Sequence, residues 1–200
     1  MSELFSIQLQ NRQQQGRDGV WLDLPTTTEQ VQAALRQIGI SSDNLQGLFI
    51  SGYFAEEEKR FAIPYNMVLA SSVDELNFLA SRLETLSTGE RAELNAALQA
   101  PQSELSSIGK ITDFPENVDY YVHLPDVHGP AQLGDYYLNR SGMVDMPEEW
   151  KGGIDTAQFG RYVAQQEQGV FTEYGYLVKS GDEWQKVHEG QPAPEEYRVL

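Results

Sequence analysis

The sequence predicts an α+β fold, organised as an elongated chain of three consecutive modules. Two alternating apolar and polar runs near the N-terminus are typical of paired strands, the middle carries apolar residues at helical spacing, and the last third mixes β-prone runs with helix signals. We expect a small antiparallel sheet with one helix in residues 1–60, a helical bundle in 61–112, and a mixed α/β module with a hairpin in 113–200.

The first module opens with alternation at 5–10 and 19–24, which predicts an antiparallel strand pair with a longer loop. Thr26 and Glu29 have the spacing of a capping box and precede apolar residues that recur every three or four positions, so a helix is expected there. The apolar, β-prone segment 46–54 supplies a further strand. Together these elements form a sheet covered by one helix.

The middle module contains two further capping-box signals. Ser72 with Glu75, and Ser87 with Glu90, each precede leucines at helical intervals, so two consecutive amphipathic helices are expected. A shorter element, SELSSIG, is expected to end at Gly109. This all-helical stretch predicts a bundle with its carboxylates on the outer faces.

The last module begins with a predicted strand in 117–127, followed by a helix in 132–139. A short helix is expected to start between Asp145 and Glu148. With the helix predicted in the next segment, this module contains three short helices in a row.

Asp155 is expected to cap the third of these helices. Two β-prone runs follow, joined by Lys-Ser-Gly-Asp at 179–182, which is typical of a hairpin turn. The proline-containing tail from Gln191 is expected to be frayed.

The chain has 30 Asp and Glu against 14 Lys and Arg, a net charge of −16, and the excess is spread over its whole length. Residues 1–60, 61–135 and 136–200 carry −3, −8 and −5. The longest carboxylate run is the triplet 56–58, so the charge belongs to a folded surface and not to an acidic tail. Such a surface repels nucleic acid and anionic lipid, and its macromolecular partners are expected to be basic.

Composition excludes several classes of protein. The chain has no cysteine, which excludes thiol nucleophiles, disulfides and thiolate metal sites. Its N-terminus, MSELFSIQLQ, has neither a basic region nor an apolar core typical of a signal peptide, and no run is long enough to span a bilayer. We therefore expect a cytoplasmic protein.

Enzymatic chemistry has one weak candidate. His123, Asp126 and His128 are residue types that bind divalent metal ions, although their spacing matches no strong motif, and a metal-dependent hydrolase is the corresponding alternative. No phosphate-binding glycine loop and no GxSxG motif are present. No cofactor is expected, and the chain is predicted not to be an enzyme.

Charge alone is typical of an ordinary soluble acidic protein, and its functional interpretation is a non-enzymatic role. Duplex DNA carries one charge per ~1.7 Å of axis, so 16 net charges match roughly 27 Å, about eight base pairs, and a two-fold dimer doubles this length. The chain can therefore present the charge of DNA to a protein whose groove is lined with Lys and Arg.

Five segments carry a resemblance to a known family: GVWLDLP at 19–25, LGDYY at 133–137, MPE at 146–148, ID at 154–155 and FGR at 159–161. In these segments the sequence resembles the ArdA antirestriction protein family, and the order of sheet, helices and mixed α/β module is similar to the layout of that family. Leu133, Tyr136, Tyr137 and Phe159 of these segments are equally consistent with ordinary core packing.

The resemblance implies a cytoplasmic, non-enzymatic inhibitor carried by mobile DNA such as a plasmid or conjugative transposon. It implies an elongated homodimer whose carboxylates imitate B-form DNA and occupy the DNA-binding groove of type I restriction-modification enzymes, with no direct contact to nucleic acid or membrane. The alternative is a protein-interaction adaptor of a mobile element that retains the fold without antirestriction activity. The carboxylates expected to act as surface charges are Asp74, Glu75, Glu84, Glu90, Glu93, Glu104, Asp113, Glu116, Asp119, Asp126, Asp135, Asp145, Glu148 and Glu149.

Overall fold

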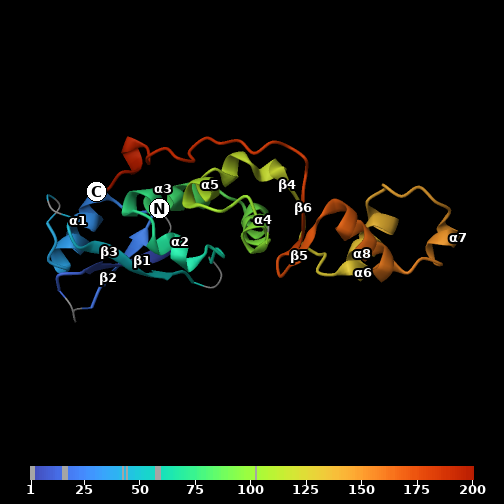
Figure 1. Ribbon diagram of the computed structural model, residues 1–200, viewed down its shortest axis with the longest axis horizontal. Coiled ribbons are helices and arrows are strands. Elements are labelled where there is room, and N and C mark those ends of the chain that lie inside the picture. The colour runs from blue at the N-terminus through green and yellow to red at the C-terminus, as the bar shows by residue number, and fades with distance from the viewer. Residues whose placement is uncertain (1–2, 15–17, 42, 44, 57–59, 102) are drawn as a thin grey trace. The chain divides into compact units, whose positions relative to one another are not determined.

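The computed structural model describes residues 3–14, 18–41, 43, 45–56, 60–101 and 103–200. Residues 15–17 of the first predicted loop, and Glu57, Glu58 and Lys59, lie outside the described residues. The predicted mixture of an N-terminal sheet, central helices and a C-terminal α/β region is confirmed (Figure 1).

Two compact units are defined by the contacts of the chain. The N-terminal unit comprises Met1–Ser87, Glu104–Glu116 and Gln185–Leu200, and the C-terminal unit comprises Thr88–Ser103 and Asn117–Trp184. The three predicted modules, which follow changes of sequence texture and not contacts, remain a prediction.

The N-terminal unit is built on a three-stranded antiparallel sheet. Its strands are β1 (Phe5–Asn11), β2 (Val20–Leu24) and β3 (Leu48–Phe54), in the order β2-β1-β3, so the predicted strand pair and third strand are confirmed. Alternate residues point to opposite faces of a strand. The buried face is formed by Phe5, Ile7, Leu9, Leu22, Leu24 and Ile50.

Helix α1 (Thr28–Gln37) covers this sheet, as predicted, but its cap is Thr27 and not Thr26. The Thr27 hydroxyl accepts from the Gln30 N–H, and the Gln30 side chain accepts from the Thr27 N–H at 3.0 Å. Thr26 is buried, and its N–H donates to Oδ1 of Asn77 at 2.7 Å. Both Thr26 and Thr27 have a Glu or Gln three positions later, so the spacing alone did not distinguish them. Thr27 is the cap because Thr26 is engaged by the hydrogen bond to Asn77.

Among its described residues, the N-terminal unit contains three further helices: α2 (Tyr65–Leu69), α3 (Val73–Glu84) and α5 (Ile108–Thr112). The predicted capping box at Ser72 and Glu75 is confirmed at the start of α3. The prediction of an element ending at Gly109 is wrong, because the Ser107 hydroxyl caps a helix that begins at Ile108. Ile108 and Ile111 are buried, so this helix is fixed by its apolar face as well as by its cap. A single turn, η2 (Phe114–Glu116), follows it.

The predicted frayed tail is also wrong, because residues 191–200 pack on α3. Ala193 and Val199 are buried on either side of the turn η5 (Glu195–Tyr197). The ring centroid of Tyr197, in this turn, lies 4.8 Å from that of Phe78 in α3. Oδ1 of Asp74 accepts from the N–H groups of Val199 at 2.7 Å and Leu200 at 3.0 Å. Prolines in the tail suggested fraying, but apolar contacts and a carboxylate acceptor hold it.

The C-terminal unit contains a second antiparallel sheet in the order β4-β6-β5, formed by β4 (Tyr121–Leu124), β5 (Val170–Thr172) and β6 (Gly175–Lys179). The strand predicted in 117–127 is confirmed in shorter form, after a turn η3 (Val118–Tyr120). Helix α4 (Thr88–Gln99), whose start after Ser87 is as predicted, packs on β6.

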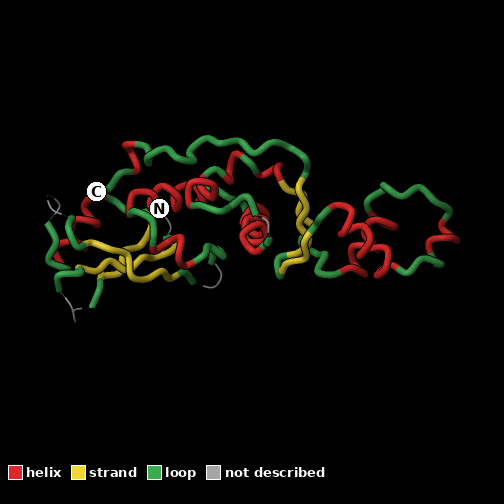
Figure 2. Tube along the Cα trace, in the orientation of Figure 1, coloured by secondary structure: helices red, strands yellow, loops and turns green. Residues whose placement is uncertain are grey.

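The hairpin of this sheet turns at Glu173 and Tyr174, so the predicted turn at 179–182 is wrong. Gly175 has a φ of +119°, and the Thr172 hydroxyl donates to the Gly175 carbonyl at 2.9 Å while accepting from the Tyr174 N–H at 3.1 Å. Residues 180–194 contain neither helix nor strand (Figure 2). The Lys-Ser-Gly-Asp segment is a bend in which the Ser180 N–H donates to the Tyr120 carbonyl.

The remaining helices are α6 (Pro130–Asp135), continued by the π-helical turn η4 (Tyr136–Arg140), then α7 (Glu148–Lys151) and α8 (Thr156–Glu167). All three predicted helices are confirmed, and Oδ1 of Asp155 caps α8 by accepting from the Gln158 N–H at 3.0 Å.

Helices α6 and α8 approach closely at two glycines. A Cβ atom on Gly134 would lie 1.9 Å from the Thr156 carbonyl oxygen, and one on Gly160 would lie 1.8 Å from that of Pro130. Any side chain at these positions would separate the helices.

Candidate functional site

Net charge is divided equally between the two units. The N-terminal unit holds 17 acidic and 9 basic residues, and the C-terminal unit holds 13 acidic and 5 basic residues, so each carries −8. The C-terminal unit is the shorter of the two and therefore has the higher net charge per residue.

None of the helices formed by the described residues is long and apolar enough to cross a lipid bilayer.

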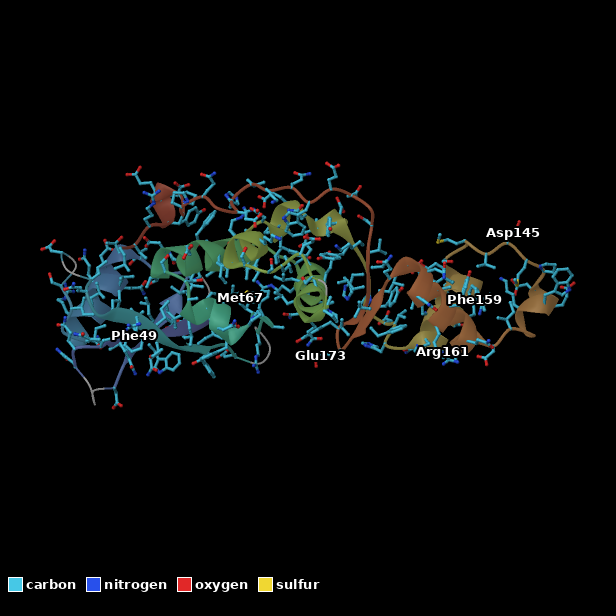
Figure 3. The ribbon with its side chains drawn as sticks, in the orientation of Figure 1. Phe49, Met67, Asp145, Phe159, Arg161 and Glu173 are labelled. Atoms are coloured by element: carbon cyan, nitrogen blue, oxygen red, sulfur yellow. The ribbon has the colours of Figure 1, made fainter. Side chains whose placement is uncertain are left out.

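The predicted surface carboxylates fall into three classes of exposure. Figure 3 shows one of the exposed class, Asp145, on the loop before α7. The exposed members are Glu75, Asp119, Asp126, Asp145, Glu148 and Glu149. The half-buried members are Asp74, Glu84, Glu90, Glu93, Glu104, Glu116 and Asp135. Asp113 alone among the fourteen is buried.

Several half-buried carboxylates are engaged by cations of their own unit. Glu116 forms an ion pair with Arg82, and Oδ2 of Asp135 lies 2.8 Å from a guanidinium nitrogen of Arg140. A hydrogen bond from the Asn139 amide, and then one from Arg140, hold the pKa of Asp135 below its usual range. These paired carboxylates present less net charge to a partner than unpaired ones do.

Asp113 is not the surface charge that the sequence predicted, because its carboxylate is fully buried. Its two oxygens accept from the backbone N–H groups of Val187 at 3.3 Å, His188 at 2.6 Å and Glu189 at 3.2 Å. The carboxylate therefore holds a segment that has no secondary structure of its own.

Glu93 on α4 differs from the other carboxylates in its protonation. Burial raises the pKa of its carboxyl group to about 8, and the nearby carboxylates of Glu90 and Asp119 act in the same direction. Oε1 of Glu93 is buried without a hydrogen-bond partner. At neutral pH the group is mostly protonated and adds little charge to the surface.

The alternative metal centre does not assemble. Nε2 of His123 lies 2.7 Å from the Tyr174 carbonyl oxygen, and Asp126 and His128 are exposed. Within the described ranges, which include all three of these residues, no group of three or more His, Asp or Glu side chains is arranged to hold a metal ion. The geometry thus gives the hydrolase alternative no support.

The core of the C-terminal unit contains much of the LGDYY segment. Leu133 is fully buried with Val127, Ala164 and Tyr176, and Tyr136 and Tyr137 pack against this cluster. Leu133 and the two tyrosines are therefore part of the core packing of this unit, which is one of the two interpretations that the sequence allowed.

Glu167 organises the edge of the same core. It accepts hydrogen bonds from the Tyr137 hydroxyl and, at 2.9 Å, from the Tyr176 hydroxyl. Burial, followed by these hydrogen bonds to Glu167, raises the pKa of both tyrosines, so both hydroxyls stay protonated and act as donors. Phe159 is half-buried and Arg161 exposed on α8 (Figure 3).

Comparison with known protein families assigns the chain. The model of the family described as antirestriction protein (ArdA) matches residues 15–178, which is most of its 200 residues. The chain belongs to the ArdA antirestriction protein family. A comparison with curated proteins gave no match.

The ArdA match extends from the first loop to strand β6 and so covers parts of both units. It includes Gly134 and Gly160, which set the close approach of α6 and α8, and Asp155, which caps α8. Antirestriction is the function that membership of the ArdA family supports, and restriction-modification enzymes are the implied partners.

Sequence reasoning missed many exposed carboxylates of this ArdA chain. Asp23 had a usable signal, since it lies between buried Leu22 and Leu24 in an alternating strand. Glu173 had none, because the hairpin turn was predicted elsewhere. The missed exposed residues are Glu3, Asp18, Asp23, Glu29, Asp43, Glu56, Asp155, Glu173, Asp182, Glu183, Glu195 and Glu196.

Proposed function

We propose that this ArdA protein is a non-enzymatic mimic of DNA that occupies the DNA-binding groove of a type I restriction-modification enzyme. The observation that carries the proposal is the equal distribution of excess negative charge over two folded units of an antirestriction protein. Each unit has nine exposed carboxylates among its described residues, which gives a basic groove many points of contact.

Charge complementarity accounts for such binding without a catalytic residue. The net charge of −16 equals that of roughly 27 Å of duplex, about eight base pairs at ~1.7 Å per charge. A groove lined with Lys and Arg attracts this surface over a Debye length of ~8 Å at physiological salt, and added salt weakens the attraction.

The proposal includes a homodimer, in which two copies present twice the length of mimicked DNA. It places the protein in the cytoplasm of a cell that carries a plasmid or conjugative transposon, where an inhibitor of restriction protects the incoming DNA. The carboxylates that take part are the exposed members of the predicted set together with the missed exposed residues of both units.

A competition assay tests the mechanism. A purified type I enzyme is bound to a labelled DNA duplex that contains its recognition sequence, and the protein is added at low and at high salt. We expect displacement of DNA at low salt and weaker displacement at high salt, because the contacts are electrostatic.

The matched control is an unrelated acidic protein of similar net charge, added at the same concentrations. Unaffected DNA binding at low salt, across several type I enzymes, would contradict the proposal, as would equal displacement by the control protein.

A further inference from the structure

The outer face of the N-terminal sheet carries two large aromatic side chains. Strand pairing aligns Asp23, Ser6 and Phe54 in one row across the sheet, and Trp21, Gln8 and Gly52 in the next. These rows lie opposite the buried face, because alternate residues of β1 and β2 are buried. Trp21 is 49% exposed and Phe54 is 57% exposed.

Gly52 makes room for the Trp21 ring on this face. A Cβ atom at residue 52 would lie 3.0 Å from Cη2 of Trp21, so the indole reaches from β2 across β1 to β3. There it meets Phe54 edge-to-face, with ring centroids 6.4 Å apart at an angle of 74°. The two rings therefore contact each other while each keeps about half of its surface in solvent.

A small hollow of about 220 Å³ adjoins Phe54. Glu3, Asp23 and Glu56 are among the residues that line it, with no basic residue among the described residues that form its wall. Oδ1 of Asp23 accepts from the Ser6 hydroxyl at 2.6 Å, which orients this carboxylate beside the aromatic pair. The surface is thus aromatic on one side and anionic on the other.

We propose that this aromatic face, formed by Trp21, Phe54 and Asp23, is a docking site for an arginine side chain of a basic protein partner. A guanidinium group stacks on aromatic rings and pairs with a carboxylate through two parallel hydrogen bonds of its planar fork. A Lys ammonium group pairs with a carboxylate only as a point charge. Trp and Arg are also the residues most often found at energetic hot spots of protein interfaces. The site rests on the proposed function only in taking the partner to be basic, and it adds an aromatic contact to the ion pairs that the carboxylates form.

The test uses the full chain labelled with ¹⁵N and observes the indole N–H signals of its three tryptophans by NMR. The probes are two acetylated and amidated peptides, Gly-Arg-Gly-Arg-Gly and Gly-Lys-Gly-Lys-Gly. We expect a saturable shift of the Trp21 signal that is larger for the arginine peptide. Trp150 is the matched control, since it is 65% exposed and follows two carboxylates in the chain, and its signal should shift less.

Two variants locate the contact. Trp21→Leu, measured through the backbone signals of β3, and Asp23→Asn, measured through Trp21, should each weaken the arginine peptide about two- to fivefold, the range of an exposed cation–π or ion-pair contact. Circular dichroism checks that each variant is folded. If Trp21→Leu is unfolded, Asp23→Asn still tests the contact.

Three results would overturn the docking site: no shift of Trp21, equal shifts of Trp21 and Trp150, or a shift of Trp21 with protein concentration alone, which would show that a second copy covers the face. These outcomes are independent of the DNA competition assay. Displacement of DNA without peptide binding would leave the proposed function standing and remove this site, and peptide binding without displacement would do the reverse.

Discussion

At Asp113, three backbone N–H groups converge on a carboxylate that has no exposed surface. We expect Asp113→Asn to lower the free energy of unfolding by about 1–3 kcal/mol, because the amide replaces one accepting oxygen by a donor and removes the charge from these hydrogen bonds. Urea denaturation followed by circular dichroism measures the change. Asp126→Asn, an exposed carboxylate with the same substitution, is the control and should change stability little; equal effects of the two would contradict the role of Asp113.

Glu93 gives the protein a pH-dependent stability of defined sign. Its folded-state pKa of about 8 exceeds the ordinary value of 4.5, so the folded state binds a proton that the unfolded state releases between these values. The stabilisation is complete below pH 4.5 and is lost as the pH rises towards 8. Because solvent reaches part of the group and screens it, we expect a loss of about 1–2 kcal/mol relative to Glu93→Gln.

Urea denaturation of the wild type and of Glu93→Gln at pH 5 and pH 8.5 measures this difference. The two proteins should be similarly stable at pH 5, and the variant should be the more stable one at pH 8.5. Glu149→Gln, which alters an exposed carboxylate, should show no such divergence; parallel pH profiles of wild type and Glu93→Gln would show that the carboxyl group titrates normally.

At the scale of elements, the contact between α6 and α8 depends on the absence of a side chain at Gly160. A Cβ atom there would lie 1.8 Å from the Pro130 carbonyl oxygen, so Gly160→Ala must separate the helices despite the better helix propensity of alanine. We expect a loss of about 2–3 kcal/mol in thermal or urea denaturation. Gly89→Ala in α4 is the control, because a Cβ atom at Gly89 meets no atom within 4 Å, and it should stabilise by about 0.5 kcal/mol. Similar effects of both substitutions would contradict the close contact.

The elements that the sequence predicted well are those whose signals are local. The capping box at Ser72 and the Asp155 cap depend on residues three positions away, and alternation in β1 depends on the pleat of a single strand. Elements fixed by distant partners were misplaced. Thr26 is diverted by Asn77, 51 residues away, and the tail is held by Asp74, more than 120 residues away.

The same division applies to the candidate site. Spread of charge along the sequence predicted an acidic folded surface, and exposure of six predicted carboxylates agrees with it. Burial of Asp113 was not predictable, because the segment 187–189 that it binds is remote in sequence and has no pattern of its own. The protonation of Glu93 likewise depends on the packing around α4, which local spacing does not encode.

At the scale of the whole molecule, charge mimicry sums many weak contacts. We expect single neutralisations such as Asp145→Asn to leave displacement of DNA from a type I enzyme nearly unchanged, since one exposed ion pair contributes about 0–1 kcal/mol. Joint neutralisation of Asp119, Asp126, Asp145, Glu148, Glu149 and Glu173, all exposed in the C-terminal unit, should abolish it.

The competition assay at low salt measures this series, and circular dichroism of each variant verifies its fold. Substituting Gln158, Gln165 and Gln166 by Ser, which changes the exposed surface of α8 without changing its charge, is the control and should have no effect. Loss of displacement from any one exposed carboxylate would point to a single decisive contact and contradict mimicry.

The anchoring of residues 191–200 on α3 also sets the order in which the protein can mature on the ribosome. The segment Gln185–Leu200 belongs to the N-terminal unit but is translated after all of the C-terminal unit. Until it emerges, Phe78 lacks its Tyr197 neighbour, and Asp113 lacks the N–H donors of residues 187–189. The N-terminal unit therefore cannot complete its core until the last residues of the chain have been synthesised, and a nascent chain stalled before residue 185 would display an incomplete N-terminal core to chaperones and proteases.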